Sequence, residues 1–114
     1  MAIDFEDDNE HVRRIVLSGR LDLPGTEAIE AKFAALATSG QRHVLVDLTS
    51  VSFIASIGIR ALITTAKAVQ KNGGKMVLLV GGNKAVVKPL ETTGIDDLIP
   101  MFADSSQAIR AALD

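Results

Sequence analysis

The 114-residue chain has no cysteine, no tyrosine and no tryptophan, and only four phenylalanines. The absence of cysteine excludes disulfides, zinc-thiolate sites and cysteine nucleophiles. The net charge of −2, the scattered Lys and Arg residues and the missing tyrosine and tryptophan argue against a nucleic-acid interface. An acidic stretch near the N-terminus, residues 4–8, is typical of a solvated hairpin turn rather than of a metal site.

Long apolar runs are also missing. None approaches the ~20 residues that a helix needs to cross a bilayer, so no membrane insertion is predicted. The first residues are acidic, whereas a signal peptide would be basic and then apolar, so we expect a cytoplasmic location. The length matches the commonest domain size and predicts a single domain over residues 1–114.

The apolar residues are chiefly Ala, Val, Ile and Leu, a composition that suits buried strands covered by helices. Their spacing predicts a hairpin of two strands, near residues 3–5 and 12–18, followed by alternating helices and strands. The later strands are expected at 43–48, 75–80 and 99–102, and the helices at about 24–39, 56–72, 84–92 and 105–113. This order, β-β-α-β-α-β-α-β-α, predicts an α/β fold with a small mixed sheet, the 43–48 strand central, and helices packed against it.

Ser56 stands where the second helix begins, just after the central strand. One interpretation makes it a helix N-cap, whose hydroxyl accepts a backbone N–H; Ser105 is expected to cap the last helix in the same way. The other is functional, because a helix N-terminus favours negative charge and can partly stabilise a phosphate on such a serine. The end of a parallel strand is also where open α/β sheets place their sites. The two interpretations do not exclude each other.

A nucleophilic serine is poorly supported. The G-x-S-x-G motif would need glycine where Ile54 stands. The chain has two histidines: His11 lies near the hairpin turn, and His43 opens the central strand at the end opposite Ser56. The loop at 81–84 follows a strand and precedes a helix but lacks both phosphate-loop signatures, so nucleotide binding there is only weakly indicated. We therefore predict no enzyme activity, no cofactor and no metal.

Five segments, in order and covering nearly the whole chain, resemble the STAS domain family, in particular its anti-sigma factor antagonists. They are Gly19-Arg20-Leu21-Asp22, residues 44–48 followed by 51–54, Ala55-Ser56-Ile57-Gly58-Ile59, residues 73–78 and residues 90–95. In that family the serine after an aspartate is the regulatory phosphorylation site, and it maps onto Ser56. The chain departs from the pattern at Ala55, where the family has the aspartate, and at Ile57, where it has a second hydroxyl residue.

The resemblance implies a partner-switching role. The unphosphorylated domain would bind an anti-sigma factor that is also an ATP-dependent serine kinase of ATPase fold, and so release a sigma factor. Phosphorylation would end that binding, and a PP2C-type serine phosphatase would restore it. The partner surface implied by the family's motifs comprises Arg20, Asp22, Ser56, Ile57 and Arg60, with Ile57 expected to be an exposed apolar anchor. The alternative is a constitutive STAS adaptor, binding a transporter ATPase or a larger signalling assembly, in which Ser56 serves only as a cap.

Overall fold

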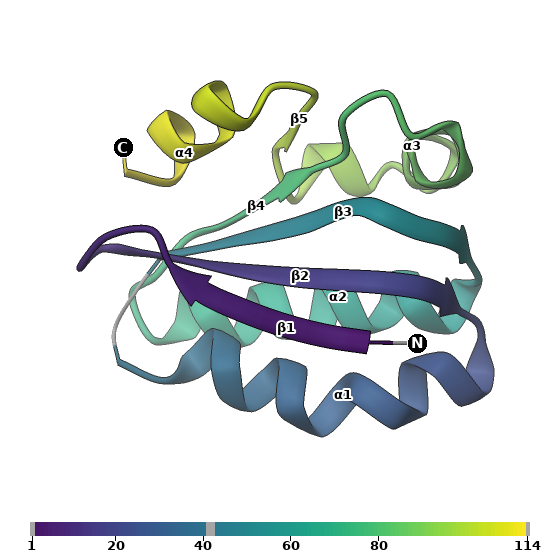
Figure 1. Ribbon diagram of the computed structural model, residues 1–114, viewed down its shortest axis with the longest axis horizontal. Coiled ribbons are helices and arrows are strands. Elements are labelled where there is room, and N and C mark those ends of the chain that lie inside the picture. The colour runs from purple at the N-terminus through teal and green to yellow at the C-terminus, as the bar shows by residue number, and fades with distance from the viewer. Residues whose placement is uncertain (1, 41–42, 114) are drawn as a thin grey trace.

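The computed structural model describes residues 2–40 and 43–113 and contains a five-stranded mixed sheet (Figure 1). Its strands lie in the order in which they follow along the chain, so the third is central. The first pair is antiparallel, and every later pair is parallel. The strands are β1 (Ala2–Asp7), β2 (Val12–Leu21), β3 (His43–Ile54), β4 (Met76–Leu79) and β5 (Met101–Phe102). The predicted α/β class, element order and central strand are confirmed.

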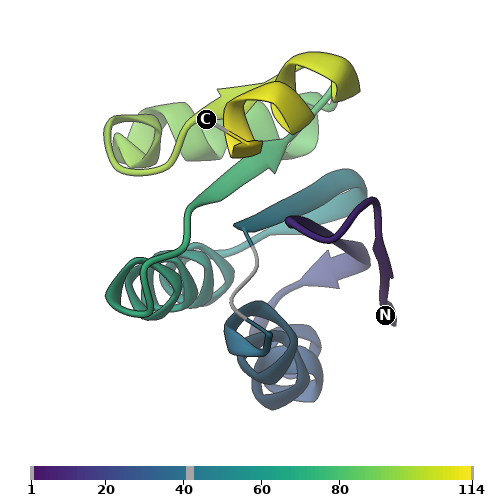
Figure 2. The same ribbon diagram turned by 90° about the vertical axis from the view of Figure 1, so that its left-hand side faces the viewer.

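Helices follow each strand from β2 onward. They are α1 (Leu23–Thr38), α2 (Ser56–Lys71), α3 (Lys84–Thr93) and α4 (Ser105–Leu113), with a short 3₁₀ helix, η1 (Ile95–Asp97), after α3. Figures 1 and 2 show α1 and α2 side by side on one face of the sheet and α4 on the other. α3 lies beside the second half of β3.

Two hydrophobic cores result from this arrangement. The larger core lies between the sheet and α1, α2 and α3, and Phe33, Leu48, Leu62 and Leu90 are among its fully buried side chains. The smaller core lies beneath α4. It consists of Val12, Leu45, Val77, Leu79, Ala108 and Ala112. Side chains alternate between the two faces along the strands, so β3 contributes to both cores.

The strands β2 and β3 are longer than their sequences predicted. β2 continues beyond Gly19, which adopts a positive φ of 84°, and pairs with β3 through two register shifts. β3 continues past residue 48 through the hydroxyl residues as far as Ile54. Thr49, Ser50 and Ser52 are exposed in this extension, whereas Val51 and Ile54 are buried. In this extension the backbone groups stay paired with β2. That pairing stabilises the strand although its sequence shows only a weak strand pattern.

Both predicted serine caps were wrong by one residue. Ser56 is the first residue of α2, and the N-cap is Ala55, whose extended backbone has φ −97° and ψ 173° and whose side chain makes no capping hydrogen bond. In α4 the Asp104 carboxylate accepts from the backbone N–H of Gln107 at 3.1 Å, while Ser105 is already helical. The position of a cap is fixed by the last extended residue before the helix, not by the nearest serine.

Candidate functional site

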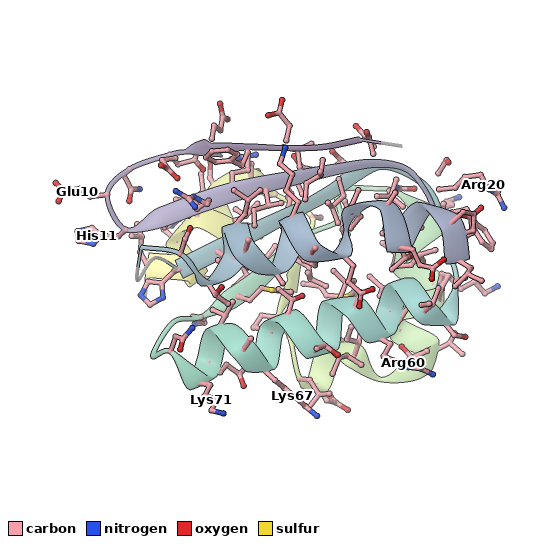
Figure 3. All side chains as sticks on the ribbon, turned by 90° about the horizontal axis from the view of Figure 1, so that it is seen from below. Glu10, His11, Arg20, Arg60, Lys67 and Lys71 are labelled. Carbon is pink, nitrogen blue, oxygen red and sulfur yellow. The ribbon has the colours of Figure 1, made fainter. Side chains whose placement is uncertain are left out.

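The carboxyl ends of β2 and β3 bring the two predicted halves of the partner surface together. Leu21 pairs with Ile54, and the backbone N–H of Ala55 donates to the Leu21 carbonyl at 3.0 Å. The residues that follow the two strands therefore lie at the same edge of the sheet. Figure 3 shows Arg20 and Arg60 at this end of the molecule, with His11 at the opposite end. We call residues 20–23 and 53–60 the carboxyl edge.

Asp22 fixes the first turn of this edge. It is the N-cap of α1, and its carboxylate accepts from the Gly25 N–H at 2.9 Å and from the Arg20 Nε at 3.1 Å. The hydrogen bond from Gly25 and then the neighbouring Arg20 guanidinium hold the pKa of Asp22 below its ordinary value. Gly25 itself is required here, because any Cβ at that position would collide with the Arg20 carbonyl oxygen.

Arg20 also contacts an aromatic side chain that the sequence analysis missed. Its guanidinium carbon lies 4.4 Å from the centre of the Phe53 ring, a cation–π arrangement across paired strands. Phe53 is 39% exposed and nearby Leu23 is 54% exposed, so both add apolar area to the carboxyl edge. Exposed aromatic and aliphatic side chains beside charged groups are typical of protein interfaces. Phe53 could have been found only by extending β3 to its true end.

Gly58 allows α2 to approach the sheet closely. A Cβ on Gly58 would lie 2.9 Å from the Leu21 carbonyl oxygen, 3.0 Å from the Leu21 Cβ and 2.9 Å from the Ile54 Cγ1. The first turn of α2 therefore rests directly on the ends of β2 and β3. This close packing sets the position of Ser56 relative to Asp22.

The remaining predicted residues lie on the first turns of α2. Ser56 is exposed, and its hydroxyl makes no hydrogen bond to any residue that the structure describes. Ile57, which we expected to be exposed, is partly buried, and Arg60 is exposed one turn later. Ser56 thus presents a hydroxyl group to solvent that the fold itself does not use.

An open groove of about 620 Å³ adjoins Ser56. Its apolar lining includes Ile54 of β3, Ile59 of α2 and Pro89 of α3. Ser56 lines its α2 side, and Lys84 and Lys88 line its α3 side. No local sequence pattern indicates this α2–α3 groove, because its lining residues come from segments about thirty residues apart.

Other kinds of site find no support in the part of the chain that the structure describes. No group of three or more His, Asp or Glu side chains there could hold a metal ion. No helix among those residues is long and apolar enough to cross a membrane. His43 begins β3 whereas Ser56 follows its end, and His11 belongs to the β1–β2 turn, so neither histidine can activate the serine.

Comparison with known proteins places this geometry in a family. The model of the STAS domain matches residues 7–108, which include both halves of the carboxyl edge. The chain belongs to the STAS domain family. This STAS domain is 31% identical over 101 residues to a Bordetella bronchiseptica protein described as an anti-sigma factor antagonist, BtrV, with 84% of the chain and 81% of that relative covered.

Two further matches extend over nearly all of this STAS domain. It is 26% identical over 102 residues to the anti-sigma-B factor antagonist of Bacillus subtilis, with 90% of the chain and 92% of the relative covered. It superimposes with a TM-score of 0.87 and 25% identity on the crystal structure of an anti-sigma factor antagonist from Mycobacterium paratuberculosis, with 99% and 94% of the two chains covered. The resemblance predicted from the sequence is confirmed.

Proposed function

We propose that this STAS domain is an anti-sigma factor antagonist, a non-enzymatic regulator of transcription that acts in the cytoplasm. It binds an anti-sigma factor through the carboxyl edge and thereby releases a sigma factor. The names of the relatives support this proposal. So does the geometry, since the two motifs shared with the family meet at one edge of the sheet.

The proposed contact surface consists of the predicted residues and two additions. Arg20, Asp22, Ser56, Ile57 and Arg60 form its polar and central part, and Phe53 and Leu23 enlarge its apolar part. The Arg20 guanidinium is already oriented by Asp22 and Phe53, so little side-chain freedom is lost when it meets a partner. Such preorganised arginine and aromatic groups commonly dominate binding energy.

The proposal that phosphorylation regulates this domain rests on one observation, the free hydroxyl of Ser56. It is exposed and serves no capping role, so modification would disturb no contact of the fold. We infer that the anti-sigma factor, as an ATP-dependent serine kinase of ATPase fold, phosphorylates it. Transfer forms a bond from Ser56 Oγ to the γ-phosphorus of ATP, breaks the bond from that phosphorus to the β–γ bridging oxygen, and releases ADP and the hydroxyl proton. A PP2C-type phosphatase reverses the modification by hydrolysis.

Phosphorylation of Ser56 adds negative charge to the carboxyl edge. A phosphoserine carries about −1.5 to −2 charges at neutral pH. Placed beside the partly buried Ile57, it would have to be desolvated when a partner covers that side chain, which opposes binding. Moving a partner from almost fully bound to almost fully free requires roughly a 10⁴-fold difference in affinity between the two forms.

The proposal is tested by titrating the purified anti-sigma partner with four forms of the domain: wild type, Ser56→Ala, Ser56→Asp and phosphorylated. We expect Ser56→Ala to bind with the same affinity as wild type. The phosphorylated form should bind at least ~100-fold more weakly, which is part of the 10⁴-fold difference that complete switching requires. Ser56→Asp should fall between them, because a carboxylate carries less charge than a phosphate. Equal affinities for all four forms would contradict the switch and favour a constitutive adaptor.

A further inference from the structure

The α2–α3 groove carries positive charge that nothing in the described fold balances. Lys84 is the first residue of α3, and Lys88 follows one turn later on the same side of the groove. Both side chains belong to exposed residues, and neither forms an ion pair with a described residue. No acidic residue is among those lining the groove.

The placement of these two lysines is electrostatically unfavourable in the unmodified domain. A cation at a helix N-terminus opposes the helix dipole, and Lys84 occupies that position in α3. Like charges spaced i, i+4 on a helix also repel, which applies to Lys84 and Lys88. The first turns of α2 and α3 contain no acidic residue that would offset either effect. An anion bound in the groove would relieve both.

Ser56 lines the α2 side of the same groove. We propose that a phosphate on Ser56 is held in the α2–α3 groove by Lys84 and Lys88. Its three acceptor oxygens can meet both ammonium groups, while Ala55, unlike an aspartate, places no like charge beside it. The biological use of this contact rests on the proposed function, but the capacity of the groove to hold the phosphate does not.

This contact gives the modification a second consequence besides added charge. In the unmodified domain the groove is open, and its apolar lining includes the partly exposed Pro89. A phosphate that contacts both lysines places a charged group over that lining and occupies the lysines at the same time. Modification would therefore remove an apolar docking surface and its positive border together.

Arg60 offers the phosphate a competing local partner. It follows Ser56 by four residues on α2, the spacing at which helical side chains interact. Charged groups at this end of the molecule are Lys84 and Lys88 from α3, Arg60 from α2, and the ion pair of Arg20 with Asp22 at the end of β2. The test must separate pairing across the groove from pairing along α2.

The experiment installs phosphoserine at position 56 during translation, so that no kinase is needed, and follows its second ionisation by ³¹P NMR. Nearby positive charges favour the dianion and lower this pKa from its ordinary value of about 6. The comparison uses the phosphorylated wild type, Lys84→Gln/Lys88→Gln, Arg60→Gln and the control Lys67→Gln/Lys71→Gln. The control lysines lie farther along α2, away from the groove (Figure 3).

We expect the pKa of the phosphate in wild type and in the control to lie roughly 0.5 or more below that in Lys84→Gln/Lys88→Gln. The same pKa in wild type and in that double variant would overturn the proposal, as would a loss of the effect in Arg60→Gln alone. The result is independent of the proposed function. If the lysine dependence is observed but Ser56 is never phosphorylated in native cells, the groove inference stands and the switch fails.

Discussion

The side-chain amide of Asn83 donates a hydrogen bond of 2.7 Å to the carbonyl oxygen of Val51, thirty-two residues earlier in the chain. The same nitrogen donates to the Leu48 carbonyl at 2.9 Å, and the Asn83 Oδ1 accepts from the Ala85 N–H at 3.1 Å as the N-cap of α3. One side chain therefore joins the second half of β3 to the start of α3. Since β3 leads into Ser56 and α3 carries Lys84, Asn83 holds the two sides of the α2–α3 groove in place.

Asn83→Ala should destabilise the domain by about 1–3 kcal/mol. The change removes the hydrogen bonds that Asn83 donates to β3, leaves partly buried carbonyl groups without their partner, and deletes a helix cap. The free energy of unfolding is measured by urea denaturation. Asn72→Ala, at the exposed end of α2, is the matched control and should change stability by less than about 0.5 kcal/mol. Equal effects of the two substitutions would refute the bridging role.

The start of α2 allows a second prediction. Because Ser56 makes no capping hydrogen bond, Ser56→Ala should change the free energy of unfolding by less than about 0.5 kcal/mol. Ala55→Ser places a hydroxyl at the true N-cap and should stabilise the domain by ~1 kcal/mol. Thermal unfolding of both variants checks this. A clear loss of stability in Ser56→Ala, with no gain in Ala55→Ser, would show that Ser56 is the N-cap after all.

Gly58→Ala should destabilise the domain by about 1–3 kcal/mol, although alanine favours helices over glycine. The added methyl group would press on the Leu21 carbonyl and on Ile54, and so move α2 away from the end of β2. Gly82→Ala is the control, because a Cβ there meets no atom within 4 Å. Denaturant unfolding gives the stabilities. Indistinguishable values for the two variants would show that α2 has room to shift.

The carboxylate of Asp22 predicts a pH dependence of stability. Its pKa is lowered in the folded protein by the Gly25 N–H and by Arg20, so its ionised form stabilises the fold. That contribution is complete above the unfolded pKa of about 4 and is lost as the pH falls through the lower folded value.

The measurement compares the melting temperature of wild type with that of Asp22→Asn from pH 7 to pH 2. Asparagine keeps an oxygen for the cap but loses the charge. Wild type should be the more stable at pH 7, and the difference should shrink below about pH 4. A difference that stays constant over the whole range would contradict the role of the charge.

Periodic apolar residues were sufficient to predict the order of the elements. Val44 and Val46, buried in the central strand, and Ile59, Leu62 and Ala66, on one face of α2, show the two spacings clearly. The last part of β3 was missed because its serine and threonine residues resemble a loop. It is a strand because Val51 and Ile54 are buried and because β2 supplies paired backbone groups.

The site was predictable only where a motif lies within one segment. Asp22 and Ser56 each belong to such a segment, and parallel pairing of β2 with β3 brings them to one edge. The α2–α3 groove depends instead on Asn83 reaching back to β3 and on α3 packing beside it, contacts that no local pattern encodes. Phe53 was overlooked for a similar reason, since the register between β2 and β3, and not a local pattern, places it opposite Arg20.

The separate small core beneath α4 has a consequence for local unfolding. α4 has nine residues, buries two alanines against the sheet, and is tied to it further by the hydrogen bond from Arg14 to Ser105 at 2.9 Å. Ser56, Asp22 and the groove lining instead adjoin the larger core. Because α4 is short and packs on the sheet only through this smaller core, its amide hydrogens should exchange with deuterium before those of β3 and α2. The C-terminal helix can therefore open and close repeatedly while the surface proposed for partner recognition keeps its shape.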